Sequence, residues 1–239
     1  MDNLSKLQNL IDRSNKIVFF GGAGVSTESG LKDFRSADGL YAQRYAYPPE
    51  FMLSHTCLAK MPEEFYKFYK DKLSVSGIKP NAAHYKLAEL EKAGKLLAVV
   101  TQNIDGLHQA AGSKRVYELH GSVHRNYCVK CGKSYTYEEL FNMNGIPKCS
   151  CGGIVKPDVV LYEEPLNDQV LNGAISAVSE ADLLIIAGTS LAVYPAASLI
   201  DFYKGEDIVI INRSPTPADS KASLVIKGKV GEVFSRLKV

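Results

Sequence analysis

Polar side chains able to take part in catalysis gather at the end of an apolar run. The run Leu96–Val100 has the composition of a strand buried in a parallel sheet, and Gln102, Asn103 and Asp105 follow it directly. Ligands of open α/β sheets bind at the carboxyl ends of strands, so these side chains are predicted to border a ligand crevice. His120 closes the same stretch and is a candidate general base, because imidazole exchanges a proton near neutral pH.

The other histidines have weaker support. An isolated histidine is more often a satisfied structural residue than a catalyst, and only His120 stands beside the predicted crevice. His55, His84, His108 and His124 are therefore interpreted as structural, with His124 as a minor alternative metal ligand because it lies close to Cys128.

A glycine-rich loop follows the first predicted strand. The apolar run Lys16–Phe20 leads into Gly21–Gly30, where glycines allow backbone N–H groups to approach a phosphate. The spacing differs from the usual dinucleotide fingerprint, because counting GxGxxG from Gly22 places Thr27 at the last glycine position. The loop favours a nucleotide site, and a plain tight turn is the alternative.

Four of the five cysteines stand in two close pairs. Cys128 and Cys131 are separated by 17 residues from Cys149 and Cys151, and glycines follow both pairs. Two tight turns that each present two thiolates predict a tetrahedral zinc site, and four thiolates make it structural because no position remains for water. A redox pair or ordinary buried cysteines are the alternative. Cys57 stands alone and is expected to be a small buried hydrophobe.

The elements around these motifs alternate between strands and helices. Four buried strands with polar carboxyl ends predict a doubly wound parallel α/β sheet with one ligand crevice, and the cysteine pairs predict an inserted zinc module. No clean helix or strand period is visible from Ser36 to Ala59. Strands are predicted at Lys16–Phe20, Leu96–Val100, Val155–Leu161, Leu183–Ala187, Ile208–Ile211 and Leu224–Ile226, and helices over 2–14, from Pro62, after Asn81, over Asn167–Ser179, from Pro195 and at the end of the chain.

Composition restricts the classes of protein. The 239 residues are 46% hydrophobic and 23% charged, and the net charge of +2 comes without any block of basic residues, so nucleic-acid binding is not predicted. The first residues lack the pattern of a signal peptide, and no apolar run reaches the roughly 18 residues of a membrane span. A cytoplasmic protein is expected, in a reducing compartment where paired cysteines suit metal better than disulfides. The oligomeric state stays open.

Taken together, the motifs resemble those of the sirtuin family of NAD-dependent protein deacylases. The resemblance covers nearly the whole chain, and its motifs are Gly22–Ser26, Ser29–Gly30, Asp33–Arg35, Thr101–Asp105, His120–Gly121, the two cysteine pairs, Gly188–Leu191 and Asn212. It implies a Rossmann-like NAD-binding domain (1–35, 81–121 and 157–239), a zinc-binding module (122–156) and a cofactor loop with a helical insertion (36–80).

The same resemblance implies the activity and the role of each site residue. The chain is expected to be a protein-lysine deacetylase that uses NAD as co-substrate and forms nicotinamide, free lysine and O-acetyl-ADP-ribose. His120 matches the base, Asn103, Ile104 and Asp105 match the nicotinamide pocket with Asn103 also catalytic, and Val159, Val160 and Leu161 match the segment that pairs with a substrate peptide. The remaining matches to NAD-contacting positions are Ala23, Ser26, Thr27, Phe34, Arg35, Gln102, Thr189, Ser190, Asn212 and Val230.

Three departures point to a bacterial branch of that family. Leu31–Lys32 replaces a common Ile-Pro, Leu161–Glu164 replaces a common Phe-Phe-Gly-Glu, and Cys149–Cys151 is a Cys-x-Cys. Tyr69 and Lys72 align with a tyrosine and an arginine that bind acidic acyl groups, and lysine lacks the planar fork of arginine, so neutral acyl chains are expected. A mono-ADP-ribosyltransferase, a deacylase of longer or acidic acyl groups and a zinc-ribbon nucleic-acid binder are the alternatives.

Overall fold

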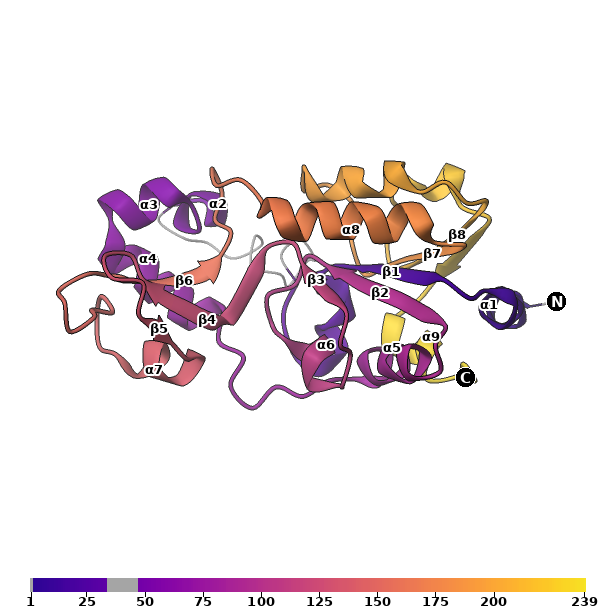
Figure 1. The fold of residues 1–239 in the computed structure, drawn as a ribbon, viewed down its shortest axis with the longest axis horizontal. Helices are drawn as coiled ribbons and strands as arrows, with labels where there is room; N and C mark the ends of the chain where they lie inside the picture. The colour runs from indigo at the N-terminus through magenta and orange to yellow at the C-terminus, as the bar shows by residue number, and fades with distance from the viewer. Residues whose placement is uncertain (1, 34–46) are drawn as a thin grey trace.

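The computed structural model describes residues 2–33 and 47–239, which form a larger and a smaller lobe (Figure 1). The larger lobe is built on a six-stranded sheet in the order β3-β2-β1-β7-β8-β9, with every neighbouring pair parallel. Its strands are β1 (Ile17–Gly21), β2 (Leu96–Thr101), β3 (Val116–Glu118), β7 (Leu183–Ala187), β8 (Asp207–Asn212) and β9 (Leu224–Lys227).

The strand order places a crevice at the middle of the sheet. From β1 the chain passes to β2 and β3 on one side and then to β7, β8 and β9 on the other, so the direction of winding reverses between β1 and β7. Loops that leave the carboxyl ends of these two central strands diverge, which opens a ligand crevice. The doubly wound parallel sheet predicted from the sequence is therefore confirmed.

Helices cover both faces of this sheet because successive strand side chains point to opposite sides. Ile17 and Phe19 pack in the same cluster as α1 and α5, whereas Val18 and Phe20 pack in the cluster that contains α8. Figure 1 shows α8 above the sheet and α5 and α9 below it. The first face carries α1 (Asn3–Arg13), α5 (Ala82–Lys92), α6 (Leu107–Ala110) and α9 (Val230–Phe234), and the second carries α8 (Asp168–Glu180) and the 3₁₀ helix η4 (Ala196–Phe202).

Most predicted helices begin where the sequence places them. Asp2 caps α1 by accepting a hydrogen bond from the Ser5 N–H, Asn81 caps α5 through the Ala83 N–H, and Asn167 caps α8. Pro62 opens α4 (Pro62–Lys72), where its missing N–H removes no helical hydrogen bond. Pro195 precedes a 3₁₀ helix rather than an α-helix.

The smaller lobe combines the helical insertion with the cysteine module. Its sheet has the order β5-β4-β6, all antiparallel, and its helices share one hydrophobic cluster with that sheet. The elements are α2 (Pro49–Met52), α3 (His55–Lys60), α4, β4 (Gly121–Cys128), β5 (Ser134–Tyr135), α7 (Tyr137–Asn142) and β6 (Val155–Val159). The predicted limits of the domains stay predictions.

Other sequence expectations also differ from the structure. The strand predicted from Val155 to Leu161 ends at Val159 and pairs with β4 in the small sheet. Strand β3 was not predicted, because three half-buried residues give too short a pattern. The part of 36–59 that the structure describes holds α2 and α3, whose four and six residues are too few to show a helical period.

Candidate active site

A cleft of about 850 Å³ lies between the two lobes, where the loops after β1, β2, β7 and β8 meet the small sheet. Every described residue that was predicted to act in catalysis, to contact the cofactor or to pair with the substrate peptide lines this cleft. They are Ala23, Ser26, Thr27, Gln102, Asn103, Ile104, Asp105, His120, Val159, Val160, Leu161, Thr189, Ser190, Asn212 and Val230. Phe34 and Arg35, also predicted to contact the cofactor, lie outside the described residues.

The glycine-rich loop packs directly on the loop after β7. The Gly24 N–H donates to the Gly188 carbonyl at 2.8 Å, and the Gly22 N–H donates to the Ala187 carbonyl at 3.2 Å. A Cβ on Gly24 would lie 2.7 Å from the Gly188 Cα, closer than any side chain tolerates. The chain continues through the short 3₁₀ helices η1 (Ala23–Val25) and η2 (Thr27–Ser29), and the backbone of the glycine-rich loop thus packs against the backbone of the loop after β7.

A buried network orients the predicted nicotinamide pocket. The Asn103 side-chain amide donates to Ser26 Oγ at 3.0 Å, and the Ser26 hydroxyl donates to Asp105 Oδ2 at 2.7 Å. The other Asp105 oxygen accepts from the Leu107 N–H at 3.0 Å and so begins α6. Burial raises the pKa of Asp105, and the hydrogen bonds from Ser26 and Leu107 oppose that effect. The loop after β2 is therefore fixed to the glycine-rich loop before any ligand binds.

A second set of hydrogen bonds joins the ends of three strands. The Thr189 hydroxyl donates to Gln102 Oε1 at 2.9 Å, and the Asn212 amide donates to the Thr189 carbonyl at 3.0 Å. Gln102 Nε2 is buried and has no partner among the described residues. A spare donor beside a wall of close-packed glycines suits a nucleotide, whose phosphate and ribose oxygens accept hydrogen bonds.

His120 is held in the tautomer that a base requires. Its Nδ1 lies 2.9 Å from the Gln102 carbonyl oxygen, which can only accept, so Nδ1 carries the proton and Nε2 is the basic nitrogen. Burial lowers the pKa of His120, although the Gln102 hydrogen bond raises it. The imidazole is thus neutral at pH 7 and can accept a proton inside the cleft.

Some residues in or beside the cleft were not predicted from the sequence. The Glu28 carboxylate accepts from the Gly231 N–H at 2.6 Å and so holds the start of α9, with Val230, against η2. Arg213 and Lys229 line the cleft itself. Each is adjacent in the sequence to a residue that was predicted to contact the cofactor, Asn212 or Val230. This adjacency could have identified both cations. The partner of Glu28 is 203 residues away, and no local pattern reveals it.

The four paired cysteines converge in the smaller lobe. Their Sγ atoms all lie within 4.8 Å of one another, with Cys128 and Cys151 at 3.5 Å and Cys131 and Cys149 at 3.6 Å. A tetrahedral zinc with bonds of about 2.3 Å separates its sulfur ligands by roughly 3.8 Å. The cluster therefore fits a closed structural zinc.

The remaining histidines and Cys57 have structural roles. His124 donates from Nε2 to the Asp105 carbonyl at 3.0 Å and is not part of the cysteine cluster. His84 and His108 are buried against each other, with ring centroids 4.7 Å apart. Cys57 is fully buried, as expected.

Tyr69 and Lys72, the two residues aligned with an acyl-binding pair, lie in different surroundings. Lys72 lines the cleft and forms an ion pair with Asp71 at 2.8 Å. Tyr69 is fully buried, packs on Phe65 and Phe141, and is not among the residues that line the cleft. The alignment that paired these two residues in one pocket is therefore wrong for Tyr69.

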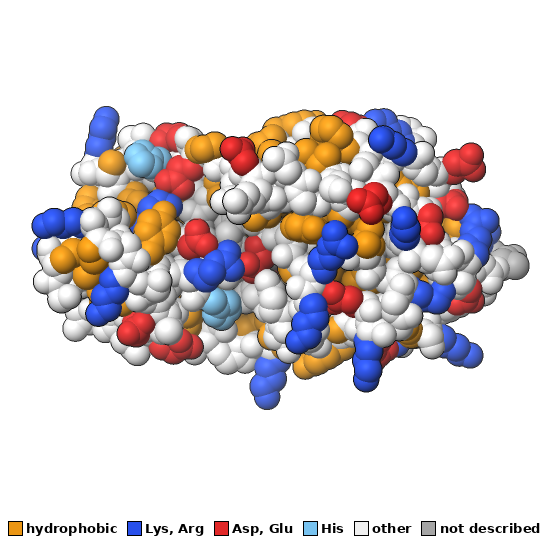
Figure 2. All heavy atoms as spheres, in the orientation of Figure 1, with side chains coloured by type: hydrophobic (Ala, Val, Ile, Leu, Met, Phe, Trp, Pro, Cys, Tyr) orange, Lys and Arg blue, Asp and Glu red, His pale blue; other side chains and the backbone are white. Residues whose placement is uncertain are grey.

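The charged side chains can be followed on one face of the molecule. Figure 2 shows acidic and basic side chains interspersed over the face it presents, without a continuous basic stripe. Within 2–33 and 47–239, no helix is long and apolar enough to cross a membrane.

Comparisons with known proteins agree on one family. The model of the Sir2 family matches residues 22–195. A protein of Clostridium perfringens named NAD-dependent protein deacetylase is 59% identical over 99% of this chain and 98% of its own, and one of Staphylococcus aureus with the same name is 44% identical over 99% and 98%. A solved structure of Sir2 with a p53 peptide and NAD⁺ is 40% identical, with a TM-score of 0.87 over 99% of this chain and 97% of the other.

Proposed function

This chain belongs to the Sir2 family, and on that premise we propose that its cleft binds NAD and an acetylated lysine side by side, with His120 as the base. The protein is an NAD-dependent protein deacetylase that forms nicotinamide, a free lysine side chain and O-acetyl-ADP-ribose. The observation that supports the roles of its residues is their convergence: the described matches come from seven separate parts of the chain between Ala23 and Val230, and all line one cleft.

Bound NAD supplies the ribose carbon that the acetyl oxygen attacks while nicotinamide leaves. For that step the chain provides a fixed amide pocket. Asn103 is held by Ser26, and Asp105 is held by Ser26 and Leu107, so the pocket needs no reorganisation when nicotinamide departs. Preorganised polar groups act most strongly in a water-poor site, and Asn103 and Asp105 are both buried.

In the second step a base is needed, because a ribose hydroxyl is a poor nucleophile. The neutral Nε2 of His120 accepts the hydroxyl proton, while the Gln102 carbonyl stabilises the resulting imidazolium through Nδ1. The same peptide unit therefore orients the base and compensates its charge.

The peptide is proposed to bind along Val159, Val160 and Leu161, which leave the end of β6 and line the cleft. Main-chain pairing places few demands on the sequence of the substrate, so many acetylated proteins could be accepted. Acetylated proteins of the cytoplasm are the proposed partners, since thiolate ligation of zinc suits a reducing compartment. Nucleic acids and membranes are not among the proposed partners.

The deciding experiment mixes the protein with NAD and an acetylated peptide. Nicotinamide release that depends on the peptide, together with O-acetyl-ADP-ribose in the mass spectrum, is the expected result. Transfer of labelled ADP-ribose to protein side chains, without loss of acetyl groups, would instead establish a mono-ADP-ribosyltransferase.

A further inference from the structure

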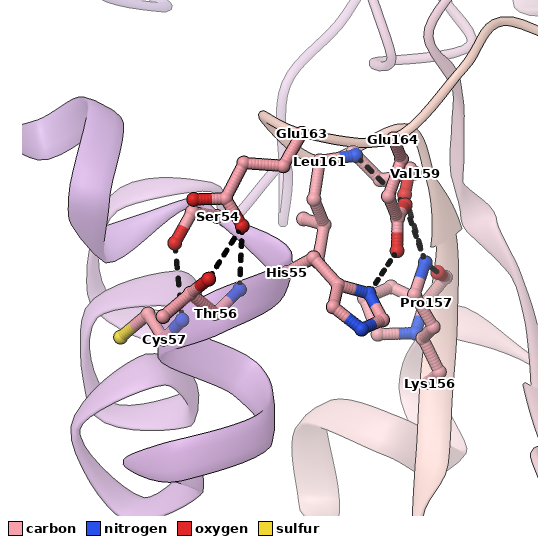
Figure 3. A network of polar contacts seen from close by, with 10 residues as sticks. All are labelled: Ser54, His55, Thr56, Cys57, Lys156, Pro157, Val159, Leu161, Glu163 and Glu164. Carbon is pink, nitrogen blue, oxygen red and sulfur yellow. Dashed lines mark hydrogen bonds and ion pairs between the residues drawn. The ribbon is translucent and has the colours of Figure 1, made fainter.

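The segment Val159–Glu164 is held by a network of ionic contacts that the proposed reaction does not itself use. Glu164 Oε2 accepts from Lys156 Nζ at 3.1 Å and from the Leu161 N–H at 3.0 Å, while Glu164 Oε1 contacts His55 Nδ1 at 3.0 Å. Figure 3 shows these groups between β6 and the start of α3. The Glu164 carboxylate thus connects β6 and the loop after it to the first residue of α3.

Lys156 is the buried cation of this network. Its side chain is only 11% exposed, and Nζ also donates to the Val159 carbonyl at 3.1 Å. A buried ammonium is costly unless it is paired and hydrogen-bonded, and Glu164 supplies the pairing. Burial tends to raise the pKa of Glu164, but the hydrogen bonds with Leu161, His55 and Lys156 lower it overall, so the carboxylate is ionised in the neutral range.

Glu163 adopts a backbone conformation that ordinarily belongs to glycine. The Glu164 N–H donates to the Leu161 carbonyl at 3.0 Å and closes a four-residue turn, in which Glu163 has a φ of 76°. This sign of φ at the third position is that of a type II turn, where glycine avoids the strain of a side chain. The strain of this conformation in a glutamate has to be offset by stabilising contacts of its side chain.

Those contacts lie at the first turn of α3. Glu163 Oε2 accepts from the Thr56 N–H at 2.9 Å and from the Thr56 hydroxyl at 2.7 Å. The backbone of Tyr162 adds two more ties, because its N–H donates to the Leu53 carbonyl and its carbonyl accepts from the His55 N–H, both at 3.0 Å. The turn is therefore fastened to the helix by side chain and main chain together.

The network occupies most backbone polar groups of the segment and leaves a few available. Besides the groups already named, the Val160 N–H donates to the His120 carbonyl at 2.9 Å. Among the described residues, the Val160 carbonyl and both backbone groups of Glu163 form no hydrogen bond. These groups belong to residues that line the cleft, where an added strand would need them.

We infer that Glu163 and Glu164, acting through Thr56, Lys156 and His55, are positioning residues that hold the backbone of Val160 and Glu163 ready to pair with the substrate peptide. The inference rests on the proposed function, since it specifies how the same cleft recognises an acetylated peptide. A fixed edge lowers the entropy lost when a peptide pairs with it, so the network should affect peptide binding more than the chemical steps.

The test compares two substrates in steady-state kinetics. One is a peptide with residues on both sides of the acetyl-lysine, and the other is acetyl-lysine with both backbone ends blocked, which has no flanking residues to pair. Glu164→Ala and Glu163→Gly should each raise KM for the peptide about tenfold, as expected for lost charge-assisted hydrogen bonds, with kcat and ADP-ribose affinity unchanged. KM for the short substrate should stay the same.

Conservative and control variants separate positioning from folding. Glu164→Gln, which can still accept from Leu161 and Lys156, should recover most of the peptide affinity. Glu163→Gly relieves the left-handed conformation, so it is expected to fold even if Glu164→Ala does not. Glu89→Gln, which removes the surface ion pair between Lys86 and Glu89 on α5, should change neither substrate.

The inference is overturned if the peptide KM of Glu163→Gly and of every folded Glu164 variant stays within about twofold of the unchanged protein. An equal rise in KM for both substrates would also overturn it, because damage to the whole cleft would then be the cause. If the unchanged protein releases no nicotinamide with the peptide, the proposed function fails instead. Direct binding of a fluorescent peptide would still compare the variants in that case.

Discussion

At the scale of single residues, His120 is the proposed base, and the proposed chemistry depends on it most. Replacing it with alanine removes the base but leaves the hydrogen bonds among Asn103, Ser26 and Asp105 in place. We expect His120→Ala to lower peptide deacetylation about 10²- to 10⁴-fold, the usual contribution of a general base, with ADP-ribose binding unchanged. Calorimetry and turnover are measured together, and a parallel loss of both would mean that His120 has a structural role.

The pH dependence follows from the burial of the same imidazole. Burial lowers the pKa of His120 below its ordinary 6.5, and only the neutral form accepts a proton, so activity falls as the pH drops through that lowered pKa. The acidic limb of kcat/KM should therefore lie below pH 6.5 and be absent from the residual activity of His120→Ala. A midpoint clearly above 6.5 would show that another group controls the reaction.

Lys72 determines what is expected of the acyl group. Its ammonium lines the cleft but is already paired with Asp71, and lysine offers no planar fork for a second carboxylate. A higher kcat/KM for acetyl-lysine than for succinyl-lysine peptides is expected, and Lys72→Ala should not reverse it. Lys67→Ala, an exposed lysine on the same helix, is the matched control. A preference for succinyl peptides that disappears only in Lys72→Ala would contradict this expectation.

At the scale of elements, the loops after β1 and β7 are in close backbone contact and form the part of the cleft that is proposed to bind the cofactor. A methyl group on Gly24 would meet the rigid Gly188 backbone at 2.7 Å, so Gly24→Ala should cost about 1–3 kcal/mol of stability and weaken ADP-ribose binding. Gly228→Ala is the control for stability alone, since its new methyl group would meet only a Val233 side-chain carbon at an ordinary 3.6 Å but Gly228 also lines the cleft. Thermal melts with and without ADP-ribose would measure both effects in Gly24→Ala, and an equal Tm of the two variants without ADP-ribose would argue against the backbone contact.

Elements with a strong local pattern were predictable, and their partners were not. The runs Lys16–Phe20 and Leu183–Ala187 are continuous and apolar, so burial between two layers of helices could be inferred from them alone. The run from Val155 has the same local character, but its partner β4 lies more than 25 residues earlier, and no local signal assigns it to the small sheet. The convergence of the predicted residues on one cleft could be anticipated because most of their motifs stand at strand ends. Glu28 could not be found in this way, because its partner Gly231 is 203 residues away.

At the scale of the whole molecule, the two lobes divide the work of the cleft. The larger lobe supplies the glycine-rich loop, the proposed nicotinamide pocket and the strand ends, whereas the smaller lobe supplies β6 and the segment after it, which is proposed to bind the peptide. Cys128 ends β4, and β4 pairs with β6, so the metal cluster is connected to the peptide side by a single pair of strands. Loss of zinc should therefore damage peptide binding before cofactor binding.

Cys128→Ala, or removal of zinc with a chelator, tests this division. A closed four-thiolate zinc contributes to folding rather than to chemistry, and a loss of at least about 3 kcal/mol would lower Tm by roughly 6–12 °C in a chain of this length. Metal content and Tm should fall together, with peptide affinity falling further than ADP-ribose affinity, because the parallel sheet contains none of the ligands. Cys57→Ala, at a buried cysteine outside the cluster, is the control and should retain its zinc. A zinc-free protein that kept its Tm and its peptide affinity, and lost only the chemical step, would place the metal in the reaction instead.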